Sequence, residues 1–229
     1  MKTKLSLALL WLTAFSMAAG CQTPQQTQTI QDLDAQLRTG ALSVGQVLTA
    51  PQWMPLHSLT AFRDVIKQYA RAERIKLTPP GEPGLNITVQ GAVADRDGRP
   101  LRDALIYVYQ TSAKGWYADT AAHILIREGD MGHARLFGYL KTDRDGRFAF
   151  ETIRPAGYPK SDLPAHIHIA LWTAGGQPIH GMPGELLFEE DERLTPERKK
   201  QALANGFLVA KNTGTEKQPV YEYRLQQKG

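Results

Sequence analysis

A hydrophobic stretch long enough to span a membrane is missing from this sequence. The longest apolar run, residues 5–17, has thirteen residues, whereas a membrane-spanning helix needs about 20. Lys2 and Lys4 precede the run, and small residues follow it. This order is typical of a secretory signal, so residues 1–20 are expected to be a removable signal peptide rather than part of the fold.

Cysteine is nearly absent as well, since Cys21 is the single cysteine among 229 residues. A disulfide within the chain is therefore excluded, and a packed core must supply the stability. Cys21 follows three small residues, which is the position of the lipid acceptor in bacterial lipoproteins. Several acyl chains, each contributing ~0.8 kcal/mol per buried CH₂, would anchor the chain to a membrane. Because Gln22 is not an aspartate, we expect the periplasmic side of the outer membrane, with plain secretion as the alternative.

An excess of positive charge is also lacking. Without the signal peptide, 25 basic residues face 23 acidic ones, which gives a net charge of +2. Nucleic-acid binding requires clustered positive charge, so a nucleic-acid partner is not expected. The roughly two hundred residues that remain suffice for one domain of good size.

The remaining chain changes character along its length. Residues 21–57 are expected to be a lipid-anchored polar tether and irregular lead-in, because residues 22–36 contain six glutamines and little apolar surface. Residues 58–229 are expected to form one domain. Three- and four-residue spacing of apolar residues predicts a helix over 58–72, and short strands between Gly/Asp turns predict a β-sandwich over 85–229. The predicted fold is therefore mainly β, with a short helical N-terminal region. The clearest predicted strands are 105–109, 136–141, 147–150, 166–172, 207–210 and 220–224.

The most informative pattern is His166-Ile167-His168-Ile169. Residues two apart in a strand point to the same face, so both imidazoles can aim at one point while the isoleucines face the core. This geometry suits a metal ion. For the pair alone, an ordinary strand with two outward-facing histidines is the alternative interpretation.

Tyr158 lies only eight residues before the first of these histidines and narrows the choice of metal. A neutral phenol with a pKa of ~10 is a poor ligand, so a strongly Lewis-acidic cation is needed to remove its proton. Ferric iron does this well. Magnesium and calcium prefer carboxylates and water, and zinc favours Cys and His.

Two longer segments resemble the intradiol ring-cleavage dioxygenases, the family of the catechol and protocatechuate dioxygenases. The first is residues 89–117, with an Asp-x-x-Gly turn at 95–98 and Gly115-Trp116-Tyr117 at its end. The second is residues 142–168, with a similar turn at 143–146 and the stretch from Tyr158 to His168 at its end. The segments occur in the family's order, and the resemblance covers roughly residues 58 to 195.

The resemblance implies a β-sandwich, an Fe(III) cofactor, and a catechol-type diol and O₂ as substrates. It implies that two tyrosines and two histidines hold the iron, with Tyr117 and His166 equatorial and Tyr158 and His168 axial. Tyr158 is then the catalytic residue, which leaves the metal when substrate binds and accepts a substrate proton. Both atoms of O₂ enter the product as the bond between the hydroxylated carbons breaks. A homo-oligomer is compatible with the resemblance, because family members often pair through helical N-terminal regions.

One position departs from the family pattern. Family enzymes usually carry an arginine directly before the Pro-Ala-His-x-His run, where this chain has Leu163. Preorganised charge of this kind can be worth ~2.7–4 kcal/mol in other sites, so its loss predicts slow turnover unless Arg135 or Arg154 replaces it. Together with these residues, Tyr109 and Trp116 are expected to line the substrate pocket.

Two further hypotheses stay open beside the enzyme. The chain could be a non-catalytic or weakly active binder of ferric iron or catecholates that keeps the ligands and turns over poorly because of Leu163. It could also be a transthyretin-like β-sandwich binding module at the cell envelope, which residues 91–108 alone would fit. The presence of all four ligand types argues against this module.

Overall fold

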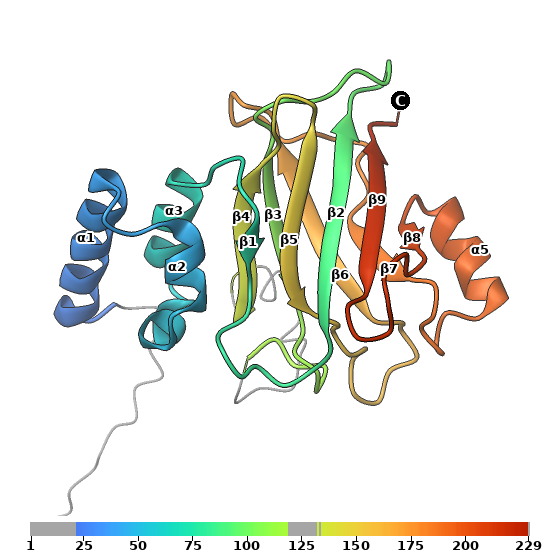
Figure 1. Ribbon diagram of the computed structural model, residues 1–229, viewed down its shortest axis with the longest axis horizontal. Helices are drawn as coiled ribbons and strands as arrows, with labels where there is room; N and C mark the ends of the chain where they lie inside the picture. Colours follow the sequence, from blue (N-terminus) through green and yellow to red (C-terminus); the bar gives the residue numbers. More distant parts are fainter. Residues whose placement is uncertain (1–21, 119–131, 133, 229) are drawn as a thin grey trace, which may run out of the picture.

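Two β-sheets packed face to face form the body of the protein (Figure 1). The structure is a computed structural model and describes residues 22–118, 132 and 134–228. One sheet has the order β1-β5-β2-β9, with β1 at Ile75–Lys76, β2 at Asn86–Ala94, β5 at Arg147–Ile153 and β9 at Val220–Gln226. The other has the order β4-β3-β6-β7-β8, with β3 at Leu105–Gln110, β4 at Leu136–Lys141, β6 at His166–Trp172, β7 at Glu185–Phe188 and β8 at Leu208–Ala210. The mainly β, sandwich-type fold is confirmed.

Alternation along the strands builds the core between the sheets. In β2, β5 and β9 most inward-facing side chains are buried, for example Val89, Phe150 and Tyr223. In β6, Ile167 and Ile169 belong to the same core, so the neighbouring histidines lie on the opposite face of their sheet. All six residues of β3 are buried, because both of its faces are covered.

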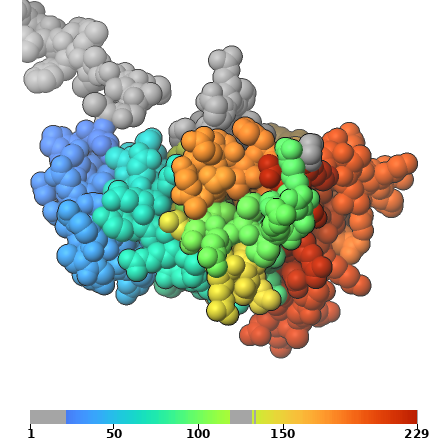
Figure 2. All heavy atoms as spheres, turned by 90° about the horizontal axis from the view of Figure 1, so that it is seen from above, coloured from blue at the N-terminus to red at the C-terminus, as the bar shows by residue number. Residues whose placement is uncertain are grey.

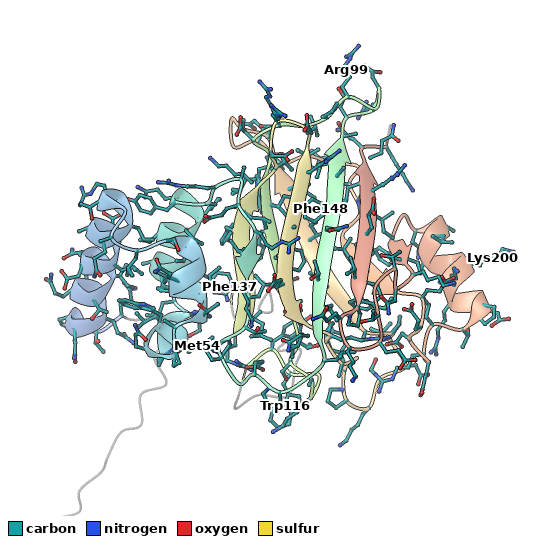
Figure 3. All side chains as sticks on the ribbon, in the orientation of Figure 1. Met54, Arg99, Trp116, Phe137, Phe148 and Lys200 are labelled. Carbon is teal, nitrogen blue, oxygen red and sulfur yellow. The ribbon has the colours of Figure 1, made fainter. Side chains whose placement is uncertain are left out.

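The two Gly/Asp turns lie side by side at one end of the sandwich (Figure 2). The amide of Val93 donates to the carbonyl oxygen of Gly146 at 2.8 Å. Gly146 has a φ of +72°, which disfavours any residue with a Cβ. Arg99 marks this end of the molecule and Trp116 the other (Figure 3). Since Trp116 adjoins Tyr117, the predicted metal ligands gather at the end away from these turns.

The N-terminal segment corrects the sequence-based expectation. Residues 22–36 were expected to be a disordered tether, but α1 (Pro24–Thr39) is a helix, closed at its start by a capping box between Thr23 and Gln26. Ile30, Leu33 and Leu37 lie on one face of this helix and are buried. Spacing of three and four residues gives even a glutamine-rich segment an apolar stripe. Counting composition alone therefore missed the helix.

The lead-in is also regular. It contains α2 (Val44–Thr49), a 3₁₀ helix η1 (Pro51–Leu56) and then α3 (Thr60–Gln68), which falls within the helix predicted over 58–72. In Figure 1 these helices lie beside the β4 edge of the sandwich, and α5 (Pro196–Ala204) lies at the other edge, near β8. None of the described helices combines the length and apolar character needed to cross a membrane. The expected signal peptide 1–20 and Cys21 lie outside the described residues.

Candidate metal centre

The four predicted ligands meet at one point. The hydroxyl oxygens of Tyr117 and Tyr158 are 2.6 Å apart. The Tyr158 oxygen lies 3.0 Å from His166 Nε2 and 3.3 Å from His168 Nε2. His168 Nε2 is 2.9 Å from the Tyr117 oxygen and 3.1 Å from His166 Nε2. Two oxygens and two nitrogens therefore converge from three separate segments of the chain.

Strand β6 sets the direction of both histidines. Its alternate residues pack into the sandwich core, which turns His166 and His168 to the outer face. Tyr109 of β3 pairs with His168 across the ladder, and the two rings stack at 4.5 Å with 8° between their planes. Tyr109 was expected to line the substrate pocket. In the structure it lies against the face of the His168 ring and fixes the orientation of that ring.

The two tyrosine segments hold each other. After β3 the chain turns through Gly115, where the amide of Ser112 bonds the carbonyl of Trp116 at 2.8 Å. The amide of Ala156 donates to the Ser112 carbonyl at 3.1 Å, which ties the Tyr158 segment to the Tyr117 segment. A Cβ at Gly115 would collide with the carbonyl oxygen of Gly157. This close approach, together with a φ of +76° at Gly115, explains the glycine in the Gly-x-Tyr motif.

Hydrogen bonding and burial prepare the imidazoles as ligands. Nδ1 of His166 lies 2.8 Å from the carbonyl oxygen of Pro164, so Nδ1 carries the proton and donates it. The Nε2 lone pair of His166 then points at the cluster. Burial, and secondly the neighbouring His166, lowers the pKa of His168 to about 3, so this ring is neutral at ordinary pH. A neutral imidazole is the form that binds a metal.

The donor set fits a cation better than a hydrogen-bond network. Five close contacts join the four atoms. Each phenol offers one proton, and His166 offers none through Nε2, so protons cannot satisfy all five contacts. A cation at the centre would be attracted to every one of these atoms. Two phenol oxygens with two imidazole nitrogens match the hard, trivalent ion predicted from Tyr158.

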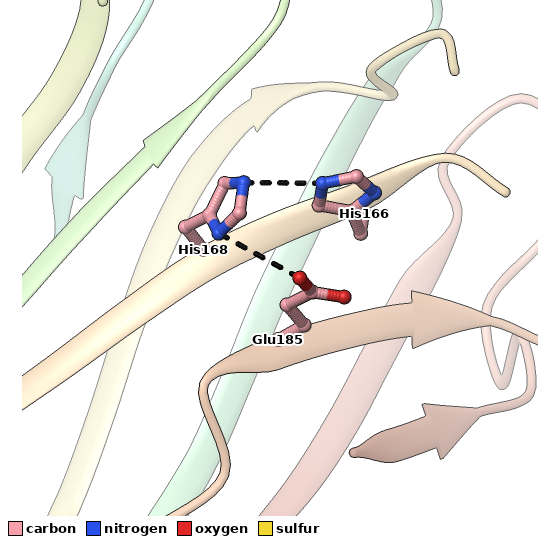
Figure 4. A group of neighbouring side chains, drawn as sticks. All are labelled: His166, His168 and Glu185. Carbon is pink, nitrogen blue, oxygen red and sulfur yellow. Dashed lines mark hydrogen bonds and ion pairs between the residues drawn. The ribbon is translucent and has the colours of Figure 1, made fainter. Parts of the chain in front are cut away.

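Glu185 is a neighbour of this cluster that sequence reasoning did not identify. It lies on β7, opposite His168 in the strand register, and its Oε1 is 4.0 Å from His168 Nδ1 (Figure 4). The carboxylate thus faces the side of the ring turned away from the tyrosines. His166, His168 and Glu185 are close enough to form a metal-binding group by themselves. We favour the tyrosine side as the metal position, because both Nε2 atoms point there. No strand was predicted over β7, so the pairing that brings Glu185 beside His168 was not foreseen.

A cavity of about 320 Å³ borders the cluster on the side of Tyr158 and His166. It extends toward α5 and contains Leu163, whose side chain is half-exposed. The lining residues are Tyr158, Leu163, Pro164, His166, Glu185, Leu187, Leu194, Arg198, Gln201, Ala202, Asn205 and Phe207. A larger hollow of about 710 Å³ lies over the outer face of β2, β5 and β9 and contains none of the four ligands.

The other predicted pocket residues lie elsewhere. Trp116 and Arg135 line a separate cavity of about 310 Å³. Both terminal nitrogens of Arg135 pair with the carboxylate of Glu82, at 2.6 and 2.7 Å. Arg154 lies over the ring of Phe188, 5.2 Å from its centre. Of the five residues predicted for the pocket, only Leu163 lines the cavity beside the cluster.

A different arginine, Arg193, approaches the loop that carries Tyr158. Nη1 of Arg193 donates to the carbonyl oxygens of Tyr158, at 3.2 Å, and Leu163, at 3.4 Å. A Cβ at Gly157 would collide with this guanidinium. Asp191 accepts a hydrogen bond from the amide of Ala165 at 3.2 Å. The segment before α5 thus clamps the loop that carries Tyr158, a tertiary contact for which the sequence gives no local signal.

The chain is similar to known dioxygenases. Residues 64–226 match the family model described as Dioxygenase. Among curated proteins, the chain is 33% identical over 147 residues to the protocatechuate 3,4-dioxygenase beta chain of Burkholderia cepacia, covering 56% of this chain and 59% of that protein. It is 37% identical over 71 residues to catechol 1,2-dioxygenase of Candida albicans, covering 31% of this chain and 22% of that protein. The chain thus spans less than two thirds of either relative.

Two dioxygenases of known structure were also compared with the chain. The dioxygenase domain of a carbohydrate-binding fusion protein from Streptomyces sp. SirexAA-E is 23% identical, with a TM-score of 0.49, over 69% of this chain and 88% of that one. The 3-chlorocatechol 1,2-dioxygenase of Rhodococcus opacus 1CP is 16% identical, also with a TM-score of 0.49, over 90% of this chain and 89% of that one.

Proposed function

The chain belongs to the intradiol ring-cleavage dioxygenase family, and we propose that it is a non-haem Fe(III) enzyme that cleaves a catechol-type aromatic diol with O₂. The observation that carries this proposal is the convergence of the Tyr117 and Tyr158 oxygens with Nε2 of His166 and His168. When bound there, ferric iron would serve as the Lewis acid and template for the diol.

The protein's own groups have distinct tasks in this proposal. Tyr158 borders both the cluster and the cavity, so its oxygen is positioned to take the proton of a diol hydroxyl. Tyr109 and the core packing of β6 hold His168 in place. Leu163, Leu187 and Leu194 offer apolar surface to an aromatic ring in the cavity. The Arg193 clamp fixes the backbone from which Tyr158 projects.

Leu163 supports a second candidate, a ferric or catecholate binder with poor turnover. Neither Arg135 nor Arg154 replaces the missing arginine, because each contacts other groups outside this cavity. The Arg193 guanidinium also contacts this loop, but it donates to the backbone carbonyls of Tyr158 and Leu163. Binding without fast cleavage is the outcome that this arrangement would favour.

Iron loading with visible spectroscopy and oxygen uptake tests both candidates. We expect a tyrosinate-to-iron charge-transfer band, which Tyr117→Phe and Tyr158→Phe each weaken or shift. Tyr139→Phe is the matched control and leaves the band unchanged, since this tyrosine stacks on Tyr107 outside the cluster. Uptake of one O₂ per diol supports the enzyme. A coloured protein without uptake supports the binder, and a colourless iron-loaded protein refutes both.

Position 163 gives a second test. Because the Leu163 side chain is 53% exposed, an arginine can be accommodated there. If the missing cation limits turnover, Leu163→Arg should raise kcat with catechol by up to about 10²-fold. No gain would contradict this account of the slow step.

We also propose that the chain is anchored to the cell envelope through lipid on Cys21, with a secreted form as the alternative. Metabolic labelling with a clickable fatty acid should mark the wild-type chain and spare Cys21→Ser. Label retained by the variant would refute the anchor.

A further inference from the structure

The cavity beside the cluster runs from the predicted metal ligands at one end to α5 at the other. Its inner end is formed by Tyr158 and His166, where the diol oxygens of a substrate would lie. Its outer part runs toward α5, past Leu163, Leu194 and Phe207. A substituent on the diol ring would therefore point away from the cluster and into this outer part. The charge of the outer part then decides which substituents are accepted.

Arg198 is the sole cation among the described residues that line the cavity, and its charge is already matched. Its Nη2 pairs with Asp162 Oδ2 at 3.1 Å. Its Nη1 donates to the carbonyl oxygens of Asp162, at 2.7 Å, and Arg193, at 3.1 Å. The other charged lining residue is Glu185, which adds a carboxylate. The cavity thus carries no net positive charge to receive an anion.

Resting on the function proposed above, we infer that this cavity selects catechols with an uncharged substituent and disfavours carboxylated ones. A substituent carboxylate placed there would lose hydration and gain no unpaired cation, in a cavity to which Glu185 adds a negative charge. An alkyl substituent would instead bury its surface against the leucines. The chain would accordingly differ in specificity from the Burkholderia relative, whose name gives protocatechuate, a carboxylated catechol, as its substrate.

Spectral titration of the iron-loaded protein without O₂ measures the affinities directly. We expect 4-methylcatechol to bind at least tenfold more tightly than protocatechuate. Asp162→Asn should release Arg198 from its ion pair and raise the affinity for protocatechuate several-fold, with little change for 4-methylcatechol. The Asp162 side chain is 89% exposed, so this variant should fold normally.

Asp97→Asn is the matched control. Asp97 pairs with Arg99 at 2.9 Å, in an exposed turn at the opposite end of the sandwich (Figure 3). It should leave both affinities unchanged. Tighter binding of protocatechuate than of 4-methylcatechol by the wild-type protein would overturn the inference, as would an Asp162→Asn variant identical to wild type. If neither diol perturbs the spectrum, the proposed function fails, which is a different result from a reversed preference.

Discussion

His57 makes the stability of the folded chain depend on pH. Its side chain is 1% exposed and packs between the rings of Phe62 and Phe137, with centroids 5.2 and 5.1 Å away. Nδ1 lies 2.7 Å from the carbonyl oxygen of Arg135 and donates to it. Nε2 is buried and has no hydrogen-bond partner among the residues that the structure describes. A second proton on this ring would place a charge in an apolar site beside the Arg63 guanidinium.

The magnitude follows from the pKa of His57. Burial, helped by the positive charges of Arg63 and Arg135, lowers this pKa from 6.5 to about 4, against the opposing hydrogen bond to the Arg135 carbonyl. Between these values the unfolded chain binds a proton that the folded chain does not. The contribution to stability is therefore complete above pH 6.5, declines as the pH falls, and is lost once the pH passes below about 4. At about 1.4 kcal/mol per pH unit, the free energy of unfolding should fall by about 3 kcal/mol across this range.

Urea denaturation at several pH values between 7 and 4 measures this loss. His57→Asn keeps a side-chain amide that can donate to the Arg135 carbonyl but cannot be protonated. The free energy of unfolding of the wild type should fall by about 3 kcal/mol more than that of the variant. Because only the pH slopes are compared, a constant loss of stability in the variant and the titration of other groups both cancel. His180→Asn, at an exposed position, is the control and should retain the wild-type slope. Parallel curves for wild type and His57→Asn would refute the reasoning.

Three further substitutions test separate parts of the structure. Gly157→Ala should displace both the Arg193 guanidinium and the Leu163 carbonyl oxygen that accepts from it, so we expect weaker iron binding and a changed charge-transfer band, measured by titration with ferric ion; an unchanged band would refute the clamp. Leu33→Ala removes a fully buried side chain of α1 and should cost about 2–5 kcal/mol in urea denaturation, whereas a loss near zero would show that α1 does not belong to the folded unit. Tyr107→Phe removes the hydroxyl group that accepts a hydrogen bond from Arg63 Nη1 at 2.6 Å and should cost about 1.5–3 kcal/mol by the same assay, which a neutral result would contradict.

Local periodicity was enough to predict the arrangement of the metal centre's histidines. Strand geometry alone dictates that His166 and His168 share a face while Ile167 and Ile169 enter the core, and the structure has this arrangement. The tyrosines needed the family motifs as well, since Tyr117 lies on a separate segment far from β6 in the sequence. The β-strands were predicted for the same local reason, because alternation and turn residues are visible within a few positions.

Contacts between segments that are distant in the sequence could not be predicted from local patterns. The contacts of Arg135 with Glu82 and of Arg154 with Phe188 join segments far apart in the sequence, so they were not predicted. Glu185 becomes a neighbour of the cluster only through the pairing of β6 with β7. In the N-terminal segment, the high glutamine content predicts a tether, whereas the spacing of its few apolar residues is that of a helix with one buried face. Sequence composition describes solubility, whereas the position of each apolar residue decides whether a helix can dock.

Two arginines, Arg193 and Arg198, contact the loop that contains Tyr158 and Leu163. Arg193 donates to the carbonyls of Tyr158 and Leu163, and Arg198 donates to that of Asp162. Two guanidinium groups therefore stiffen the backbone of the same short loop. A third arginine at position 163 would add to this local positive charge, which the Asp162 carboxylate now balances on Arg198. Under the proposed function, Leu163 offers apolar surface where an arginine could have faced the diol, while Arg193 and Arg198 hold the loop that carries Tyr158. Apolar surface at this position favours the binding of an aromatic ring with an uncharged substituent, but it leaves the negative charge of the bound diol without a facing cation. Leu163 would therefore account for both the expected slow turnover and the expected substrate preference.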